Sequence, residues 1–593
     1  MTLTPPAAFT TRPTLTGTFG MAASTHWLAT ASAQAVLERG GNAFDAVVAG
    51  GFVLHVVEPH LNGPGGDLVG IFATAEAPDT PVVLMGQGPA PAGATIAHYR
   101  AEGLDLVPGA GGLAAAVPAA VDAWLLLLRD HGTLELADVL SYAIGYAQDG
   151  APLLPAAAAT IGRVADLFRE HWPSSAELWM PEGTVPEAGT LVRNPAYARV
   201  LEGLIAAGAG APDRAARIDA ARTEWKTGLV AHAASAFLSA PHRHSSGTDH
   251  AAVIAPEDFA AFDAGYEDAV TAPFRGHTIA KAGPWTQGPA LLETMRILDG
   301  LADDDIDPST ARGAHTILEA LKLALADRDA YLGDGAPVDD LLSDDYIAAR
   351  RALIGDTASH EWRPGTLPDR EPFRPALRTE AAAAAGTGEP TVARTGDTRG
   401  DTCHIDVVDR WGNIVAVTPS GGWLQSSPTI PELGFCLGTR LQMTWLDEAS
   451  PSALRPGRRP RTTLTPTLVL RDGRARMALG TPGGDQQEQW QVPALIRMLA
   501  GGYTGQQAID APTLHSVALV DSFWPRTWSP AGAVVEDRLG DGVVAELRER
   551  GHEVVRAGDW ALGRLSAVGI DRERGLVWAA ANARGMQGYA AGR

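Results

Sequence analysis

Residues 401–420 read DTCHIDVVDRWGNIVAVTPS, and this stretch decides the predicted fold. Two β-prone runs, Thr402–Asp409 and Asn413–Pro419, flank Arg410-Trp411-Gly412, which is typical of a hairpin turn. The preceding residues, Ala376–Gly400, are rich in Ala, Gly and Thr and poor in large apolar side chains, which predicts a flexible linker. Thr402 therefore stands where a linker gives way to a strand.

A threonine at such a boundary has a possible chemical role. Its hydroxyl is a poor nucleophile unless a base takes its proton, and its own α-amino group can be that base once the preceding peptide bond is cut. The reference pKa of an α-amino group is about 8, so part of it is neutral near pH 7. A cut at the end of a mobile segment would place the new N-terminus on a rigid strand. Alternatively, Thr402 is only a β-forming residue.

Helical patterns dominate the sequence before the linker, and paired strands dominate after it. Helices are predicted at His26–Arg39, Phe44–Val57 with Asn42 as its cap, Pro118–Arg129, Leu136–Gln148, Pro289–Leu298, Ala314–Tyr331, Gln486–Leu499 and Val543–Arg550. Further strand pairs are predicted at Leu464–Arg471 with Ala475–Leu479, and at Ser566–Asp571 with Gly575–Ala581. This order predicts an α+β fold in which helices pack on sheets.

The composition excludes several classes of protein. The 593 residues are 45% apolar and carry a net charge of −22, which argues against a nucleic-acid partner. The N-terminal residues lack the basic and apolar regions of a signal peptide, and no apolar run is long enough to span a membrane. Cys403 and Cys436 are the only cysteines, so no disulfide framework is expected. We expect a cytoplasmic protein without a membrane partner.

A glycine-rich turn, Gly480–Asp485, follows one predicted strand and precedes a helix. Backbone N–H groups at such a turn can stabilise an oxyanion. The alternative is a tight strand-to-helix turn without a chemical role. Its glycine spacing does not match a dinucleotide-binding fingerprint.

Other possible sites are weaker. His242, His244 and His250 match no zinc template, and we expect them in a solvated loop, so no metal and no cofactor is predicted. The G-x-S-x-G motif of serine hydrolases is absent from the sequence. Three tryptophans are expected in the core or in pocket walls: Trp423, Trp445 and Trp490.

Taken together, the segments resemble the gamma-glutamyltranspeptidase family of N-terminal-nucleophile hydrolases. The segments, in the family's order, are GGNAFDAVVAGGFVLHVVEPHLNGPGGD (40–67), PEDFAAF (256–262), FRGHTI (274–279), PWTQGPALLETMRIL (284–298), ADRDAYLGD (326–334), DTCHIDVVDRWGNIVAVTPS (401–420), RPRTTLTPTLVLRDG (459–473) and GTPGGDQQ (480–487). One such match would be weak, but this many in order is highly specific.

The resemblance implies a four-layer αββα sandwich made as one precursor and cut before Thr402. The large subunit would be residues 1–401, ending in the linker 376–401, and the small subunit residues 402–593. It further implies that Thr402 is the nucleophile, with Thr418 and Ser420 as its hydrogen-bond partners. Gly483 and Gly484 would form the oxyanion hole, and Thr462, Thr463 and Asp485 would lie on the substrate side. His404 would lie near the nucleophile or merely pack in the sheet.

The sequence departs from the family where γ-glutamyl groups are recognised. Residues 85–91, MGQGPAP, lack the expected arginine, and Gln442 stands at the expected acidic position. Gly421-Gly422-Trp423 replaces an expected asparagine, which puts Trp423 in the pocket. Losing both partners of a zwitterion removes charge-assisted bonds. Arg440 is expected to bind a substrate carboxylate instead, or else to pair with an acidic surface neighbour.

The sequence thus predicts a self-processing amidohydrolase or acyltransferase that acts on a small-molecule amide and is not γ-glutamyl-specific. The short stretch between Trp445 and Arg461 leaves little room for a lid, as in a lid-less branch similar to oxamate amidohydrolases or acylases. Two alternatives stay open: a true γ-glutamyl hydrolase or transpeptidase, and an unprocessed, catalytically silent binding protein. The processed heterodimers could also associate into a homo-oligomer.

Overall fold

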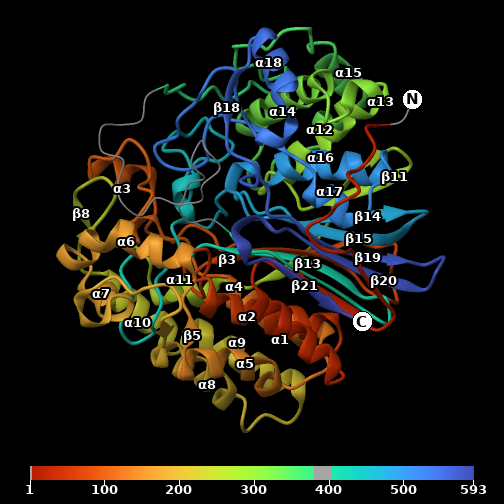
Figure 1. Ribbon diagram of the computed structural model, residues 1–593. Coiled ribbons are helices and arrows are strands. Elements are labelled where there is room, and N and C mark those ends of the chain that lie inside the picture. Colours follow the sequence, from red (N-terminus) through yellow and green to blue (C-terminus); the bar gives the residue numbers. More distant parts are fainter. Residues whose placement is uncertain (1–2, 380–401) are drawn as a thin grey trace.

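The computed structural model describes residues 3–379 and 402–593, arranged as a four-layer αββα sandwich (Figure 1). The predicted linker, 376–401, lies outside the described residues except for its first four, of which Arg378 bridges Thr527. The predicted α+β class and layering are confirmed.

Two seven-stranded sheets form the centre of the molecule, and every strand pairs antiparallel with its neighbours. The first sheet has the order β1 (Leu15–Gly17), β20 (Leu576–Ala581), β19 (Ser566–Asp571), β15 (Arg474–Gly480), β14 (Thr467–Arg471), β11 (His277–Lys281) and β10 (Val270–Phe274). The second has the order β21 (Tyr589–Gly592), β2 (Gly20–Ser24), β12 (Ile405–Asp409), β13 (Ile414–Ser420), β3 (Asp67–Ala73), β4 (Val82–Gly86) and β9 (Gly265–Asp268). Both sheets therefore join strands from before and after the linker.

Both faces of the second sheet are buried, which explains its nearly continuous apolar strands. Along β13, Val415 and Val417 face the helices, whereas Ile414 and Ala416 belong to the cluster between the sheets. Because side chains alternate along a strand, one short run of residues supplies both contacts.

Helices cover the outer face of each sheet (Figure 1). Those on the second sheet include α1 (Trp27–Glu38), α2 (Ala43–Val57), α4 (Ala120–His131) and α5 (Leu136–Asp149). Those on the side of the first sheet include α12 (Gly288–Asp299), α16 (Gln487–Leu499) and α17 (Gly505–Asp510), with α14 (Ala311–Tyr331) packed on α12 and α18 (Asp541–Glu549) packed on α14. Asn42 caps α2 in a capping box with Asp45, as expected for its start. In the described part of the chain, no helix is long and apolar enough to cross a membrane.

The predicted helices are confirmed to within about three residues, with one correction and one omission. Pro118 lies two residues before α4 and is not its first helical residue. A group of five helices was not predicted: α6 (Pro155–Glu170), α7 (Pro173–Trp179), α8 (Pro195–Ala207), α9 (Arg214–Thr227) and α10 (Leu229–Leu238). The buried residues of α6 and α8 recur at helical spacing, so the pattern that predicts a helix was present there in the sequence.

Candidate functional site

Thr402 lies three residues before β12 and forms an isolated antiparallel bridge with Ser420, the last residue of β13. Its hydroxyl donates to Ser420 Oγ at 3.1 Å and accepts from Gln487 Nε2 at 3.4 Å. The Cys403 N–H donates to the Pro419 carbonyl at 2.9 Å, which extends the pairing up to Thr402. The Thr402 hydroxyl is thus held between the second sheet and the first turn of α16, with 2% of the residue exposed.

The register of the β12–β13 hairpin corrects the expectation for Thr418. Ile405 pairs with Val417, so His404 lies opposite Thr418 and Thr402 lies opposite Ser420. The Thr418 hydroxyl accordingly bonds His404 Nδ1 at 2.8 Å, and not Thr402. His404 Nε2 contacts Asp406 at 2.8 Å, and Ser566 Oγ donates to the same carboxylate at 2.6 Å.

These buried hydrogen bonds, from Thr418 through His404 and Asp406 to Ser566, link the two sheets. Burial raises the pKa of Asp406, although the neighbouring His404 opposes the shift. A side chain at Gly480 would stand 2.3 Å from the His404 ring, so the imidazole closely contacts the end of β15. Thr418 and His404 therefore support the strand that carries Thr402.

The glycine turn joins β15 to α16 through a short 3-10 helix, Gly484–Gln486. Both glycines have positive φ, 137° at Gly483 and 53° at Gly484, which a side chain disfavours. A Cβ at Gly483 would lie 2.3 Å from the buried Trp490 ring, and one at Gly484 would lie 2.9 Å from Phe523. Alanine at Gly483 would therefore disturb the core as well as the turn, because a buried indole fills the space that its side chain would need.

Asp485 anchors this turn to the first-sheet side of the molecule. Its carboxylate forms a buried ion pair with Arg328 of α14 and accepts from the Ser522 hydroxyl at 2.6 Å and the Ser522 N–H at 2.7 Å. Arg328 also donates to Gln287 Oε1 at 2.8 Å, and Gln287 Nε2 donates to the Gly484 carbonyl at 3.2 Å. Both Asp485 oxygens are thus occupied by protein donors that orient the turn.

Arg440 forms a bidentate ion pair with Asp67 and does not pair with an acidic surface neighbour. Its Nε and Nη2 lie 2.6 and 2.7 Å from the two Asp67 oxygens, and both side chains are buried. Asp67 pairs with Ser420 across β3 and β13, so this ion pair lies beside the nucleophile. Burial raises the pKa of Asp67, and Arg440 opposes the shift. Asp67, Arg440 and Gln87 line a small cavity of about 10 Å³ beside this ion pair.

We expect Arg440→Met to destabilise the protein. The substitution leaves the Asp67 carboxylate buried without its partner, and breaking a buried pair typically costs about 3–5 kcal/mol. Urea denaturation should show a lower midpoint, whereas the double variant Asp67→Leu/Arg440→Met should recover most of the loss. Arg458→Met, which removes an exposed arginine that forms no ion pair with the described residues, is the matched control. An unchanged midpoint in Arg440→Met would contradict this account of the pair.

The remaining predicted pocket residues come from three separate segments. Trp423 packs with Met443 and Phe523 in a small apolar cluster, and Phe523 in turn contacts Gly484. The Gln442 amide accepts from the Trp524 N–H at 3.2 Å and donates to Thr439 Oγ1 at 3.0 Å, so it links two loops.

Thr462 and Thr463 differ in how their polar groups are bonded. The Thr462 hydroxyl accepts from the Leu464 N–H at 3.3 Å. The Thr463 hydroxyl is buried and has no hydrogen-bond partner within the described residues.

Several residues that the fold brings to this site were not predicted as site residues from the sequence. Gln487 stood in the quoted motif GTPGGDQQ, and Arg461 directly precedes the predicted pair Thr462 and Thr463. Arg328 stood in the quoted segment ADRDAYLGD, but nothing there indicated its partner. Phe523 belongs to the loop between β16 (Leu514–Ser516) and β17 (Gly532–Val535), and no motif in that loop indicated a role for it.

Two histidines of the loop, His244 and His250, are buried, which corrects the prediction of a solvated loop for them, whereas His242 is half-buried and residues 247–249 are exposed. His244 Nε2 accepts from the Leu113 N–H at 2.8 Å, and its Nδ1 contacts the His242 carbonyl at 2.8 Å. His250 pairs with Glu102 at 2.7 Å. Within residues 3–379 and 402–593, the potential metal ligands that cluster are His315, Glu319 and His552. The two imidazoles there bond each other at 2.9 Å, and Glu319 already pairs with Lys322 and Arg363.

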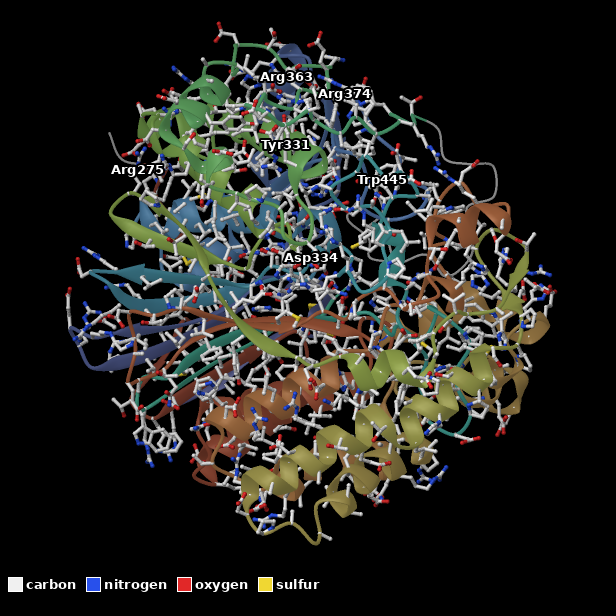
Figure 2. The ribbon with its side chains drawn as sticks, turned by 180° about the vertical axis from the view of Figure 1, so that it is seen from behind. Arg275, Tyr331, Asp334, Arg363, Arg374 and Trp445 are labelled. Carbon is white, nitrogen blue, oxygen red and sulfur yellow. The ribbon has the colours of Figure 1, made fainter. Side chains whose placement is uncertain are left out.

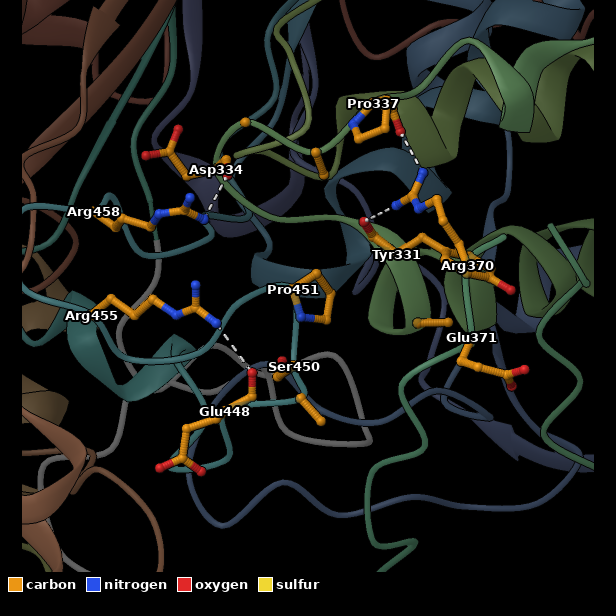
Figure 3. Close-up of a pocket in the computed structure, with 14 residues that line it drawn as sticks. Tyr331, Asp334, Pro337, Arg370, Glu371, Glu448, Ser450, Pro451, Arg455 and Arg458 are labelled. Carbon is orange, nitrogen blue, oxygen red and sulfur yellow. Dashed lines mark hydrogen bonds between the residues drawn. The ribbon is translucent and has the colours of Figure 1, made fainter. Parts of the chain in front are cut away.

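An open pocket of about 350 Å³ lies at the outer end of the segments that carry Arg328 and Arg461 (Figure 3). Residues 330–337, 370–371, 448–451 and 455–458 contribute to its walls. Arg370, Arg455 and Arg458 donate there to backbone carbonyls, at 3.1 to 3.4 Å. Figure 2 labels Tyr331 and Asp334 of this wall together with Trp445, whose ring stacks on Arg526 at 4.0 Å.

Comparisons with known proteins agree with this geometry. A model of the gamma-glutamyltranspeptidase family matches residues 29–592. The chain is 30% identical to the oxamate amidohydrolase proenzyme of Klebsiella pneumoniae, over 97% of this chain and 98% of that protein. It is 29% identical to the glutathione hydrolase-like YwrD proenzyme of Bacillus subtilis, over 96% and 98%. The solved structure of LmbA2991HD is 52% identical, covers 99% of this chain and 100% of its own, and superposes with a TM-score of 0.93.

Proposed function

This chain belongs to the gamma-glutamyltranspeptidase family, and on that premise we propose that it is a self-cleaving amidohydrolase with Thr402 as its nucleophile. The observation that carries the proposal is the position of the Thr402 hydroxyl, between Ser420 Oγ and Gln487 Nε2. Gln487 is the first residue of α16, directly after the turn that contains Gly483 and Gly484. A nucleophile and a set of backbone donors thus lie at one junction of the two sheets.

Processing would begin with attack of the Thr402 hydroxyl on the carbonyl carbon of Asp401. The peptide C–N bond breaks as the ester C–O bond forms, which frees the Thr402 α-amino group. Water then opens the ester and leaves a carboxylate on Asp401. The names of the relatives support this step, because they are described as proenzymes.

Turnover would use the same hydroxyl, with the free α-amino group as general base. The amine takes the hydroxyl proton as Thr402 Oγ1 attacks the substrate carbonyl, and passes it to the leaving amine. N–H groups of the glycine turn would stabilise the oxyanion of the tetrahedral intermediate. Water then hydrolyses the acyl-Thr402 ester to a carboxylic acid and restores the hydroxyl.

The acyl group is proposed to be other than γ-glutamyl, because the described carboxylates next to Ser420 and to the glycine turn already pair with arginines. Gln442 stands where an acid was expected, and both Asp67 and Asp485 are occupied by arginines. A substrate ammonium entering this buried site would lose its hydration without gaining a partner, which is costly.

We expect the processed enzyme to hydrolyse glutaryl p-nitroanilide better than γ-glutamyl p-nitroanilide. The two substrates differ only in the α-amino group, so the ratio of their kcat/KM values reports the free-energy cost of bringing the ammonium into the buried site. The ratio of kcat/KM should be at least about tenfold, equivalent to ~1.4 kcal/mol. Steady-state release of p-nitroaniline measures both.

Efficient, saturable turnover of the γ-glutamyl anilide would show that the enzyme is instead a true γ-glutamyl hydrolase. A chain that stays uncut on denaturing electrophoresis and hydrolyses neither anilide would fit a silent binding protein.

A further inference from the structure

Arg461 carries a buried guanidinium nitrogen without a partner. The residue is 2% exposed, and its Nη2 donates to Ser522 Oγ at 2.8 Å and lies 3.5 Å from Asp329 Oδ1. Its Nη1 has no hydrogen-bond partner within the described residues. A buried charged donor left unsatisfied is costly, so such an atom needs an explanation.

Two further arginines lie near Arg461, and both have partners that hold their guanidiniums. Arg328, Arg461 and Arg526 are all buried there, but Arg328 already pairs with both Asp329 and Asp485. Arg526 donates to the backbone carbonyls of residues 442 and 444, at 2.7 and 2.9 Å.

Burial and the neighbouring Arg328 lower the pKa of Arg461 to about 10, and the carboxylates of Asp329, Asp485 and Glu488 oppose the shift. Arg461 is therefore a cation near neutral pH, with one of its donors unbonded by the described residues.

Hydrogen bonds link Arg461 to the glycine turn, and its segment to the residue that contacts Thr402. Ser522, which accepts from Arg461, also bonds Asp485, the residue that follows Gly484. Thr463, two residues after Arg461, has its own unpartnered buried hydroxyl. Thr465 donates its N–H to Gln487 Oε1 at 3.3 Å, and the Gln487 amide donates to the Thr402 hydroxyl. The segment 461–465 is thus bonded to the residue that holds the nucleophile.

Arg440, the arginine expected to bind a substrate carboxylate, is less suited to this role. Its Nε and Nη2 are taken by Asp67, whose charge neutralises it, and its Nη1 contacts Met443 Sδ at 3.5 Å. A carboxylate there would compete with a bidentate partner, whereas at Arg461 it would meet a free donor.

We propose that Arg461, together with the Thr463 hydroxyl, binds a carboxylate on the acyl portion of the substrate, so that the enzyme selects amides of dicarboxylic acids. The inference rests on the proposed amidohydrolase function and names its substrate class. The carboxylate supplies the acceptor that Nη1 of Arg461 lacks among the described residues.

The test uses the processed enzyme and two matched substrates, glutaryl p-nitroanilide and the same anilide with its carboxylate replaced by a carboxamide. The wild type should prefer the carboxylate by about 10²-fold in kcat/KM, the size of effect expected for a buried charge-assisted contact. Arg461→Met should lose that preference, with the carboxamide substrate changed by less than about threefold. Arg461→Lys should recover part of the preference, because lysine keeps the charge but not the fork of donors.

Arg458→Met is the matched control, since Arg458 lies three residues away in the outer pocket (Figure 3) and should alter neither substrate. Equal loss on both substrates in Arg461→Met would assign Arg461 a structural role and overturn the proposal. A wild type that cleaves both anilides equally would overturn it without any variant. That result would leave the amidohydrolase function standing, whereas an uncut wild type that cleaves neither would remove the function itself.

Discussion

The Thr402→Ala variant is expected to remain a single chain of 593 residues and to hydrolyse no amide. Neither the attacking hydroxyl nor the free α-amino base can form in this variant, so processing and turnover fail together. Removal of the nucleophile from other covalent hydrolases costs on the order of 10⁶-fold in kcat. Denaturing electrophoresis and an anilide assay measure the two losses.

Thr402→Ser is the matched control for this experiment. Serine keeps the hydroxyl that contacts Ser420 and Gln487, so the variant should still cut itself and retain turnover at a reduced rate. In the wild type, the smaller fragment should begin TCHIDVVD and contain residues 402–593. A different N-terminus, or hydrolysis by Thr402→Ala, would contradict the proposed nucleophile.

Gly484→Ala is expected to lower kcat by about 10²–10³-fold, the usual cost of losing one oxyanion donor, ~3–4 kcal/mol. The new Cβ would lie 2.9 Å from Phe523 Cε2, so the turn or the ring must shift and the N–H groups of the turn move with it. Left-handed backbone also penalises alanine, by about 1–2 kcal/mol. Gly484 is the better choice than Gly483, where the clash with Trp490 at 2.3 Å would disturb the core.

The control for Gly484→Ala is Gly473→Ala, at the turn between β14 and β15. Gly473 has φ 71° and nothing within 4 Å of its Cβ position, so it carries the same backbone penalty without a neighbour to displace. Its kcat should stay near the wild-type value, while thermal unfolding shows a similar small loss in both variants. Normal turnover in Gly484→Ala would indicate that the glycine turn has no part in catalysis.

Local patterns in the sequence determined much of this protein. The two β-prone runs and the turn at 410–412 predicted the β12–β13 hairpin, and the sequence placed the glycine turn between β15 and α16. The resemblance was likewise carried by short segments in order, and the family match confirms it. Helices α6 to α10 were not predicted, although the buried residues of α6 and α8 recur at the helical spacing that a sequence can show.

Hairpin register decided the partner of Thr418, which the family resemblance had placed at Thr402. A pairing of Ile405 with Val417 sets Thr402 opposite Ser420 and His404 opposite Thr418, so Thr418 bonds the histidine. A shift of register by one residue would have turned these side chains to the other face of the sheet.

Only the tertiary structure decided which charged groups meet. Asp67 and Arg440 are 373 positions apart, and Arg328 and Asp485 are 157 apart. Periodicity shows which face of an element is buried, but it carries no information on which distant element packs there. For that reason the sequence identified Arg440 as a candidate cation but not its partner. Packing also determines which arginine is available to a substrate. Arg440 is paired with Asp67, whereas Nη1 of Arg461 has no partner among the described residues.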